Sequence, residues 1–266
     1  MTEFGKDHRL RIYFGTRLFE AQGLFFDKDG TLVDLHHQYS TLMDKRVEKI
    51  LDHHPGKKEE VRSALCRAVG YDPHSRTIAP SGPLAVATRE QTLKIVIHFL
   101  SQQGFPLGEG EKIARESFRL ADLELGLDEL IRPMNGLYSL LQALNGGKIF
   151  LACLTNDEHR RAQSILEFLK ISVFFHLVLG GDEVNRPKPD PEMIETACKR
   201  LMLLPEQIVY IGDTAADMIM AKRAGAGLAV GVLGGAANES LLSAEADIVI
   251  PNLEAISIPD NREFIN

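Results

Sequence analysis

The chain changes its pattern of apolar and polar positions twice, near residue 34 and near residue 133. Before the first change, Gly23–Phe26 is a short apolar run that leads directly into polar residues. A short apolar run bounded by turn residues is typical of a strand buried on both faces of a sheet. A second run, Arg11–Phe14, predicts a short edge strand near the N-terminus.

Residues 35–132 show helical periodicity and no run that is typical of a buried strand. Apolar residues recur three or four positions apart in four stretches, as in Val47, Ile50 and Leu51. This spacing places apolar side chains on one face of a helix. Prolines and a glycine within residues 77–83 would interrupt a helix there. The block therefore predicts a helical domain inserted after the first buried strand.

From Pro133 onward, apolar runs alternate with helical patterns. The predicted strands cover residues 148–154, 174–179, 208–211, 228–232 and 247–250, and the predicted helices cover 158–169, 191–201 and 217–224. Strands that alternate with helices form a parallel sheet with helices on both faces. The pattern thus predicts a Rossmann-like α/β core domain from residues 1–34 and 133–266, with a helical domain inserted as residues 35–132.

Composition narrows the class of protein. Of the 266 residues, 44% are hydrophobic and 25% charged, which is ordinary for a globular protein. The formal net charge of -7 argues against nucleic acid or an anionic membrane as a partner. No apolar run approaches the length of about 18 residues that a membrane span needs, and charged residues near the N-terminus interrupt any signal-peptide core.

The three cysteines, Cys66, Cys153 and Cys198, are widely spaced and odd in number. This pattern predicts a reduced, cytoplasmic setting rather than a disulfide framework. Because no Cys-x-x-Cys pair occurs, a cysteine-based metal site is not expected.

Polar residues able to do chemistry follow three of the predicted strands. They are Asp27 and Asp29 after the first, Thr155 and Asn156 after the second, and Asp213 and Asp217 after the third. Lys188 lies between the last two groups, flanked by prolines that predict an extended backbone. Because parallel strands end at the same edge of a sheet, we expect these side chains in one crevice.

The charges of these residues indicate what the crevice could bind. Clustered carboxylates without cysteine or convergent histidines are hard oxygen ligands, which favours Mg²⁺. A metal, a lysine, a threonine hydroxyl and helix N-terminal amides together suit a phosphate group. A carboxylate beside that phosphate could attack it and form an aspartyl phosphate.

Four motifs in order resemble those of the haloacid dehalogenase superfamily, in its phosphatase branch with a helical cap after the first strand. The motifs are Asp27-Lys28-Asp29-Gly30-Thr31, Leu154-Thr155-Asn156, Lys188 within Arg-Pro-Lys-Pro-Asp-Pro, and Gly212-Asp213-Thr214-Ala215-Ala216-Asp217-Met218. The resemblance covers about residues 20–255 and is greatest to phosphoglycolate phosphatases and their relatives. Lys28 is a departure, since relatives more often carry an apolar residue there, but it changes none of the roles that the resemblance implies.

The resemblance implies catalytic and metal-binding roles for the four aspartates. Asp27 would be the nucleophile. Asp29 would protonate the leaving oxygen and then activate the water that hydrolyses the aspartyl phosphate. Mg²⁺ would be held by a carboxylate oxygen of Asp27, the backbone carbonyl of Asp29, and Asp213, with Asp217 close by.

The resemblance also implies a set of phosphate-binding residues. Thr155 and Lys188 would hold the phosphoryl oxygens and count among the catalytic residues. Thr31 and Asn156 would add further contacts to the phosphate. These roles agree with the charges, because phosphoryl transfer is mostly positioning plus neutralisation of oxygen charge.

The expected activity is a Mg²⁺-dependent phosphatase that hydrolyses a small phosphorylated metabolite, with the helical cap closing over the site to exclude water and select the substrate. Phosphoglycolate is favoured by the resemblance alone, and sugar phosphates, nucleotides and pyrophosphate stay open. Arg76 and Arg89 could contact substrate, although a surface role is favoured. A monomer or a homodimer is expected.

Several rival functions are disfavoured by particular residues. Phosphosugar mutases tend to carry another residue where Thr31 stands, which weighs mildly against a phosphotransferase. Dehalogenases lack the second aspartate of the first motif, and phosphonate hydrolases depart from the pattern at Asp29. A receiver-like signalling module would be about half this length and has no place for the helical block. Complete motifs argue against an inactive scaffold.

Overall fold

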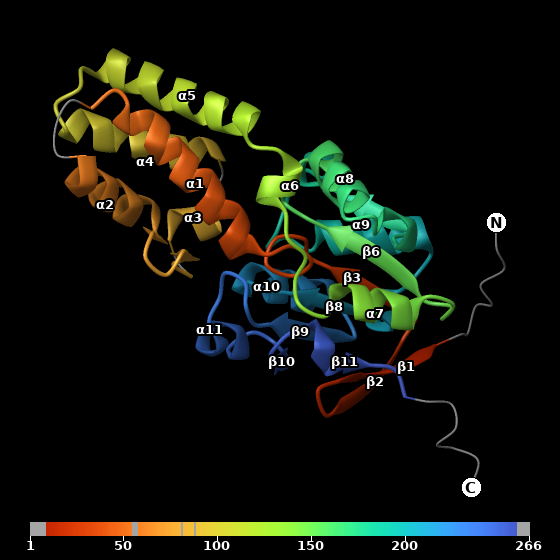
Figure 1. The fold of residues 1–266 in the computed structure, drawn as a ribbon. Helices are drawn as coiled ribbons and strands as arrows, with labels where there is room; N and C mark the ends of the chain where they lie inside the picture. The colour runs from red at the N-terminus through yellow and green to blue at the C-terminus, as the bar shows by residue number, and fades with distance from the viewer. Residues whose placement is uncertain (1–8, 55–57, 81, 88, 260–266) are drawn as a thin grey trace, which may run out of the picture. The chain divides into compact units, whose positions relative to one another are not determined.

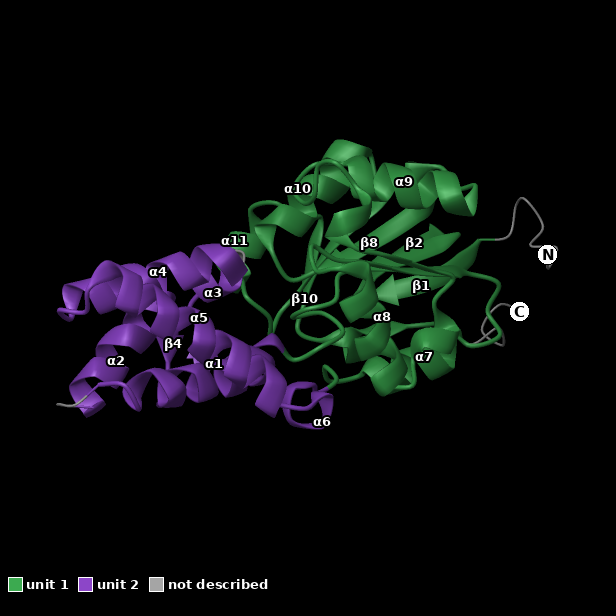
Figure 2. Cartoon of the chain, turned by 90° about the horizontal axis from the view of Figure 1, so that it is seen from above, with its two compact units in different colours: residues 1–34, 133–266 green, residues 35–132 purple. Residues whose placement is uncertain are grey.

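The computed structural model describes residues 9–54, 58–80, 82–87 and 89–259 (Figure 1). The chain divides into two compact units, which Figure 2 colours separately. We call residues 1–34 and 133–266 the core unit and residues 35–132 the helical unit.

The core unit is built on a six-stranded parallel sheet with the strand order β10-β9-β8-β3-β6-β7. Its strands are β3 (Gly23–Phe26), β6 (Phe150–Leu154), β7 (Leu177–Leu179), β8 (Ile208–Gly212), β9 (Leu228–Val232) and β10 (Ile248–Ile250). All four residues of β3 are buried, which confirms the prediction of a strand covered on both faces. In register, Phe26 lies opposite Cys153 of β6 and Ile211 of β8, so these three strands end side by side.

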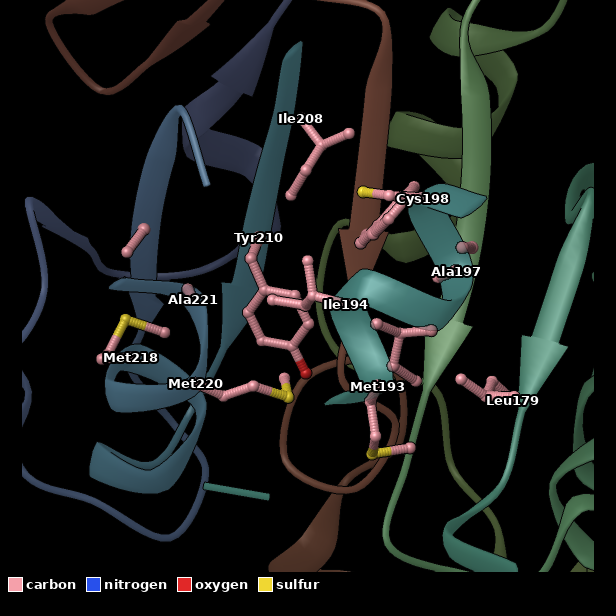
Figure 3. Close-up of a cluster of buried hydrophobic side chains, with 14 of the residues drawn as sticks. Leu179, Met193, Ile194, Ala197, Cys198, Ile208, Tyr210, Met218, Met220 and Ala221 are labelled. Atoms are coloured by element: carbon pink, nitrogen blue, oxygen red, sulfur yellow. The ribbon is translucent and has the colours of Figure 1, made fainter. Parts of the chain in front are cut away.

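Helices cover both faces of this sheet, as predicted. They are α7 (Leu137–Leu144), α8 (His159–Phe168), α9 (Glu192–Leu201), α10 (Ala215–Ala224) and the short α11 (Glu239–Ser243). Helices α9 and α10 lie on one side of the sheet, and α7 and α8 lie on the other (Figure 2). On the α9 side, Tyr210 of β8 packs among Met193, Ile194 and Met220 in a fully buried cluster (Figure 3).

A smaller antiparallel sheet of the core unit differs from the sequence prediction. Its order is β11 (Ile256–Ser257), β1 (Leu10–Phe14), β2 (Arg17–Ala21). The predicted edge strand therefore exists, but it is the central strand, because β11 from the far end of the chain pairs with it. Strand β2 had not been predicted. Gly15, at φ +60°, allows the tight turn that joins β1 to β2.

Several predicted boundaries of the core unit are also wrong. Strand β6, for example, begins at Phe150 rather than at residue 148. The apolar run at residues 174–179 is a strand only from Leu177, because a 3₁₀ turn, Ser172–Phe174, comes first. The Phe175 ring meets Phe26 edge-on at 6.2 Å between ring centroids, so this residue is apolar without being in a strand. Helix α10 begins at Ala215, two residues before the predicted start, because Thr214 is its N-cap.

The helical unit contains α1 (Leu35–Leu51), α2 (Lys58–Val69), α3 (Pro83–Val86), α4 (Arg89–Gln102), α5 (Leu107–Glu124) and α6 (Leu127–Leu130). The break predicted within residues 77–83 is confirmed, since a two-stranded hairpin of β4 (Tyr71–Asp72) and β5 (Thr77–Ile78) precedes α3. Met43 and Val47 of α1 and Phe118 of α5 are fully buried in the interior of this unit.

Charged side chains bind the helices of this unit to one another. Arg46 is only 4% exposed, lies over the Phe118 ring and donates to Asp122 at 3.0 Å. Arg89 donates to the other oxygen of Asp122 at 2.6 Å. Arg76 likewise pairs with an aspartate of α1, Asp44. Arg76 and Arg89 therefore have structural partners inside the helical unit.

No helix among the described residues is both long and apolar enough to cross a membrane.

Candidate active site

The loop that follows β3 folds back tightly on itself. The Gly30 N–H donates to the Val33 carbonyl at 2.7 Å, and the Val33 N–H donates to the Lys28 carbonyl at 2.9 Å. Gly30 has φ +90°, and a Cβ there would lie 2.1 Å from Oδ2 of Asp213. Glycine is required at this position for both reasons, and it lets the loop lie directly against the Asp213 carboxylate.

Three carboxylates come together at the ends of β3 and β8. Asp27, Asp213 and Asp217 each place one oxygen within 4.8 Å of the others, and all three are buried. Burial, opposed by Lys188 and reinforced by nearby carboxylates, raises the pKa of Asp27 to about 7. Burial together with the charges of Asp27 and Asp217 also raises the pKa of Asp213 well above its usual range. The cluster is therefore costly unless cations accompany it.

Lys188 supplies one cation to this cluster. Its Nζ hydrogen-bonds Oδ1 of Asp27 and lies 2.8 Å from Oδ1 of Asp217. Burial alone would lower the pKa of Lys188, but these two carboxylates raise it well above its usual value. The prediction of an extended backbone here is wrong, since the segment turns and the Asp190 N–H donates to the Pro187 carbonyl at 3.1 Å. The peptide bond between Lys188 and Pro189 is cis.

The remaining negative charge fits a divalent cation. Oδ2 of Asp213 accepts the Ala236 N–H at 2.6 Å, but its Oδ1 is buried and has no hydrogen-bond partner among the described residues. Leaving a buried carboxylate oxygen without a partner is expensive. Lys188 contacts two of the three carboxylates, Asp27 and Asp217, and the oxygens of the cluster are the hard ligands that Mg²⁺ prefers. The donor set therefore suits Mg²⁺ without the cysteines or histidines of a zinc site.

Asp217 also holds the start of α10. Its Oδ2 accepts the Thr214 N–H at 3.1 Å, and the Thr214 hydroxyl accepts the Asp217 N–H at 3.2 Å, forming a capping box. Its Oδ1 accepts the buried Tyr210 hydroxyl at 3.0 Å. Sequence reasoning missed Tyr210. The available signal was a hydroxyl-bearing aromatic within an otherwise aliphatic strand that leads to the acidic motif.

The predicted phosphate-binding residues have varied surroundings. The Thr155 hydroxyl accepts the Asp157 N–H at 3.1 Å, which forms a short turn after β6. Oδ1 of Asn156 accepts the Lys188 N–H at 3.0 Å, so Asn156 helps to place the lysine. Thr31 is fully buried, and its hydroxyl has no partner among the described residues. Their contacts with a phosphate remain predictions.

Lys28 is the second residue that sequence reasoning missed. It is fully buried, and its Nζ lies 2.8 Å from each carboxylate oxygen of Asp29 and 3.0 Å from Oδ2 of Asp157. The signal available in the sequence was a charged residue directly after a strand covered on both faces. Because a buried ammonium is costly unless paired, its presence there implied acidic partners.

The chain is similar in sequence to several known proteins. The family model described as haloacid dehalogenase-like hydrolase matches residues 21–225. A phosphoglycolate phosphatase from Salmonella choleraesuis is 35% identical over 135 residues, which cover 47% of this chain and 52% of that protein. The chain thus matches about half the length of that relative. A phosphoglycolate phosphatase from Salmonella paratyphi A is 28% identical over 261 residues, covering 94% of this chain and 99% of that protein.

Solved structures show the same fold. The crystal structure of a predicted phosphoglycolate phosphatase from Haemophilus somnus has a TM-score of 0.64 to this chain at 23% identity. The match covers 88% of this chain and 95% of the other. At this identity the likeness shows the fold alone.

Proposed function

The chain belongs to the haloacid dehalogenase-like hydrolase family, and we propose that within it the protein is a Mg²⁺-dependent phosphatase acting on a small phosphomonoester. The observation that carries this proposal is the buried cluster of Asp27, Asp213 and Asp217 with Lys188, at the edge where β3 and β8 end. Such a cluster combines a nucleophilic carboxylate with the positive charge that a phosphate requires.

In the proposed first step, a carboxylate oxygen of Asp27 attacks the phosphorus atom and forms an aspartyl phosphate. The bond from phosphorus to the leaving oxygen breaks, and its electron pair goes to that oxygen. Asp29 donates a proton to the leaving oxygen, so an alcohol departs. Lys188, which contacts Asp27, would neutralise phosphoryl oxygens as the two anions approach each other.

In the second step, water replaces the alcohol. Asp29, now a carboxylate, accepts a proton from the water as its oxygen attacks phosphorus. The bond between phosphorus and Asp27 breaks, which releases phosphate and restores the free carboxylate. Thr155, with Thr31 and Asn156, would hold the phosphoryl oxygens through both steps.

The metal would be held by a carboxylate oxygen of Asp27, the backbone carbonyl of Asp29, and Asp213, with Asp217 close by. Oδ1 of Asp213, which has no hydrogen-bond partner in the described part of the chain, supports this assignment. When bound, Mg²⁺ neutralises the charge that otherwise keeps an anionic carboxylate away from an anionic phosphate.

Phosphoglycolate is the proposed substrate. A relative named phosphoglycolate phosphatase, which matches nearly the whole chain, supports this choice. Sugar phosphates, nucleotides and pyrophosphate are the alternative substrates. A phosphotransferase or mutase is the alternative reaction, and a receiver-like module or an inactive scaffold is the alternative without catalysis. The helical unit is proposed to act as a cap that selects the substrate and excludes water, and the protein is proposed to work in the cytoplasm.

A panel of phosphorylated metabolites, assayed for phosphate release with and without Mg²⁺, tests this proposal. We expect Mg²⁺-dependent release, and a loss of at least about 1,000-fold in kcat for Asp27→Asn, which lacks the nucleophile. Asp52→Asn, which changes an exposed carboxylate of the helical unit, should behave as the wild type.

Four results would contradict the proposal in different ways. Activity retained by Asp27→Asn would remove the nucleophile assignment. Phosphate release without Mg²⁺ would contradict the proposed dependence on the metal. Interconversion of sugar phosphates with no phosphate release would identify a mutase, whereas no turnover even of p-nitrophenyl phosphate would identify a scaffold.

A further inference from the structure

We propose that Lys28 is a positioning residue that holds the Asp29 carboxylate in place for proton transfer and ties it to the loop after β6. The inference rests on the proposed function, because it concerns the residue that would exchange protons with the leaving oxygen and with water. It adds a residue to which neither the motifs nor the proposed mechanism gives a role.

The contact between Lys28 and Asp29 is bidentate. Nζ of Lys28 lies 2.8 Å from both Oδ1 and Oδ2 of Asp29. Charge-assisted hydrogen bonds of this length are among the stronger ones in proteins. Contact with both oxygens restricts the rotation of the carboxylate as well as its position. A proton donor must be held close to its geometry of reaction, so this restriction bears directly on catalysis.

Lys28 is in turn held by Asp157, which lies 129 positions later in the chain. Nζ of Lys28 lies 3.0 Å from Oδ2 of Asp157, and Arg161 contacts the same oxygen at 3.1 Å. The other oxygen accepts the Glu158 N–H at 2.9 Å, and the Asp157 N–H donates to Thr155. Asp157 is therefore fixed from several sides, and it provides a firm anchor for the lysine.

The two lysines of the site contact different carboxylates. Lys188 contacts Asp27 and Asp217 of the acidic cluster, whereas Lys28 contacts Asp29 and Asp157 outside it. Only one residue separates Asp27 from Asp29, and the two carboxylates repel each other when charged. By holding Asp29 on its own cation, Lys28 keeps this carboxylate from competing with Asp27 for Lys188 or for a metal.

Two aryl phosphates separate a role through Asp29 from a general loss of structure. The p-nitrophenolate anion departs readily without a proton. Phenolate, whose acid has a pKa of about 10 like the tyrosine phenol, benefits far more from protonation as it leaves. Loss of a well-placed proton donor therefore slows phosphoryl transfer from phenyl phosphate more than from p-nitrophenyl phosphate.

The test is kcat/KM for both esters with Lys28→Met, since kcat/KM reports the step in which the phenol departs. We expect a fall of about tenfold or more with phenyl phosphate and of about threefold or less with p-nitrophenyl phosphate. Lys28→Arg, which can still contact both oxygens of Asp29, should recover most of the phenyl phosphate activity. The exposed Lys199→Met is the matched control and should change neither ester.

A double variant makes the test specific for Asp29. If Lys28 acts through Asp29, then Lys28→Met should cost little further activity in an Asp29→Asn background, because the two effects are not additive. Lys28→Gln, which keeps a hydrogen-bond donor without the charge, replaces Lys28→Met if the latter does not give a cooperative thermal transition.

Equal losses with the two esters would overturn the inference, and so would full additivity in the double variant. These outcomes differ from a failure of the proposed function. That failure would appear in the wild type, as absent phosphate release, or in an active Asp27→Asn variant, and it would remove this inference as well.

Discussion

Asp27, the proposed nucleophile, lies where its charged form destabilises the folded protein. In the metal-free protein it is a buried carboxylate beside two others, and its pKa is raised to about 7. An unfolded chain would release this proton near pH 4, so the folded state binds more protons between about pH 4 and pH 7. The sign is therefore unusual for an aspartate, because its contribution to stability is lost as the pH rises through this window.

A divalent cation should reverse this behaviour. Below about pH 7 the metal must displace a proton from Asp27, whereas above it the carboxylate is already charged. We predict that a fixed concentration of Mg²⁺ raises the melting temperature more at about pH 8 than at about pH 6. Thermal denaturation with and without Mg²⁺ measures this difference.

Asp27→Asn provides the control for that experiment. Without metal it should raise the melting temperature at about pH 8, where it removes a charge, and change it little at about pH 6, where the wild-type group is largely protonated. A Mg²⁺ shift that is equal or larger at the lower pH would speak against binding at these carboxylates.

At the residue scale, the sequence indicated the charged groups but not all of their contacts. Asp27, Asp213, Asp217 and Lys188 were expected together, and the structure brings them together. The sequence did not indicate a role for Lys28, because the partners of this lysine depend on where its side chain points. One of those partners, Asp157, comes from a different strand end, which no local pattern could place.

At the scale of elements, apolar runs located strands well wherever burial dictated the composition. The apolar runs that form β3, β6, β8 and β9 all predicted strands, because a strand covered on both faces must be apolar throughout. The pairing of β1 with β11 and the late start of β7 were not found. Pairing partners and the burial of loop residues are set by neighbours distant in sequence, so local periodicity does not contain them.

Two glycines at positive φ allow the loop after β3 to be tested. Gly30 has φ +90° and Gly225, which ends α10, has φ +74°, but only at Gly30 would a Cβ meet Asp213. We expect Gly225→Ala to cost about 1–2 kcal/mol of stability from backbone strain alone. Gly30→Ala should in addition lower activity by about tenfold or more, because a displaced Asp213 would be a poorer ligand for the proposed metal.

Measurements of stability by urea denaturation and of phosphate release in both variants would separate the two effects. A Gly30→Ala variant with wild-type activity and only the strain cost would show that the close approach to Asp213 is not needed for catalysis.

At the scale of the whole molecule, the helical unit is inserted where the chain leaves and re-enters the core at neighbouring positions. Val33 pairs with Pro133, and the Met134 N–H donates to the Leu32 carbonyl at 3.0 Å. A short linker can therefore replace residues 35–132 at a small entropic cost. The main sheet and the acidic cluster lie entirely within the core unit.

We predict that a variant in which a short Gly/Ser linker replaces residues 35–132 folds cooperatively and is still stabilised by Mg²⁺. Its preference among phosphomonoesters should largely disappear, and kcat/KM should fall more for the best metabolite than for p-nitrophenyl phosphate. Circular dichroism, thermal denaturation and the metabolite panel measure these outcomes. Unchanged selectivity would show that the helical unit does not choose the substrate.

The sequence by itself determined the parallel sheet, the helical block after its first strand, and the residues that could react. Burial on both faces of a strand and the spacing of apolar residues leave direct marks in composition, as do carboxylates at strand ends. Only the tertiary structure decided how the charges pair, with Lys188 on Asp27 and Lys28 on Asp157. Such pairing depends on distances of a few ångströms between segments far apart in the chain, and charge attraction between them leaves no periodic trace in sequence.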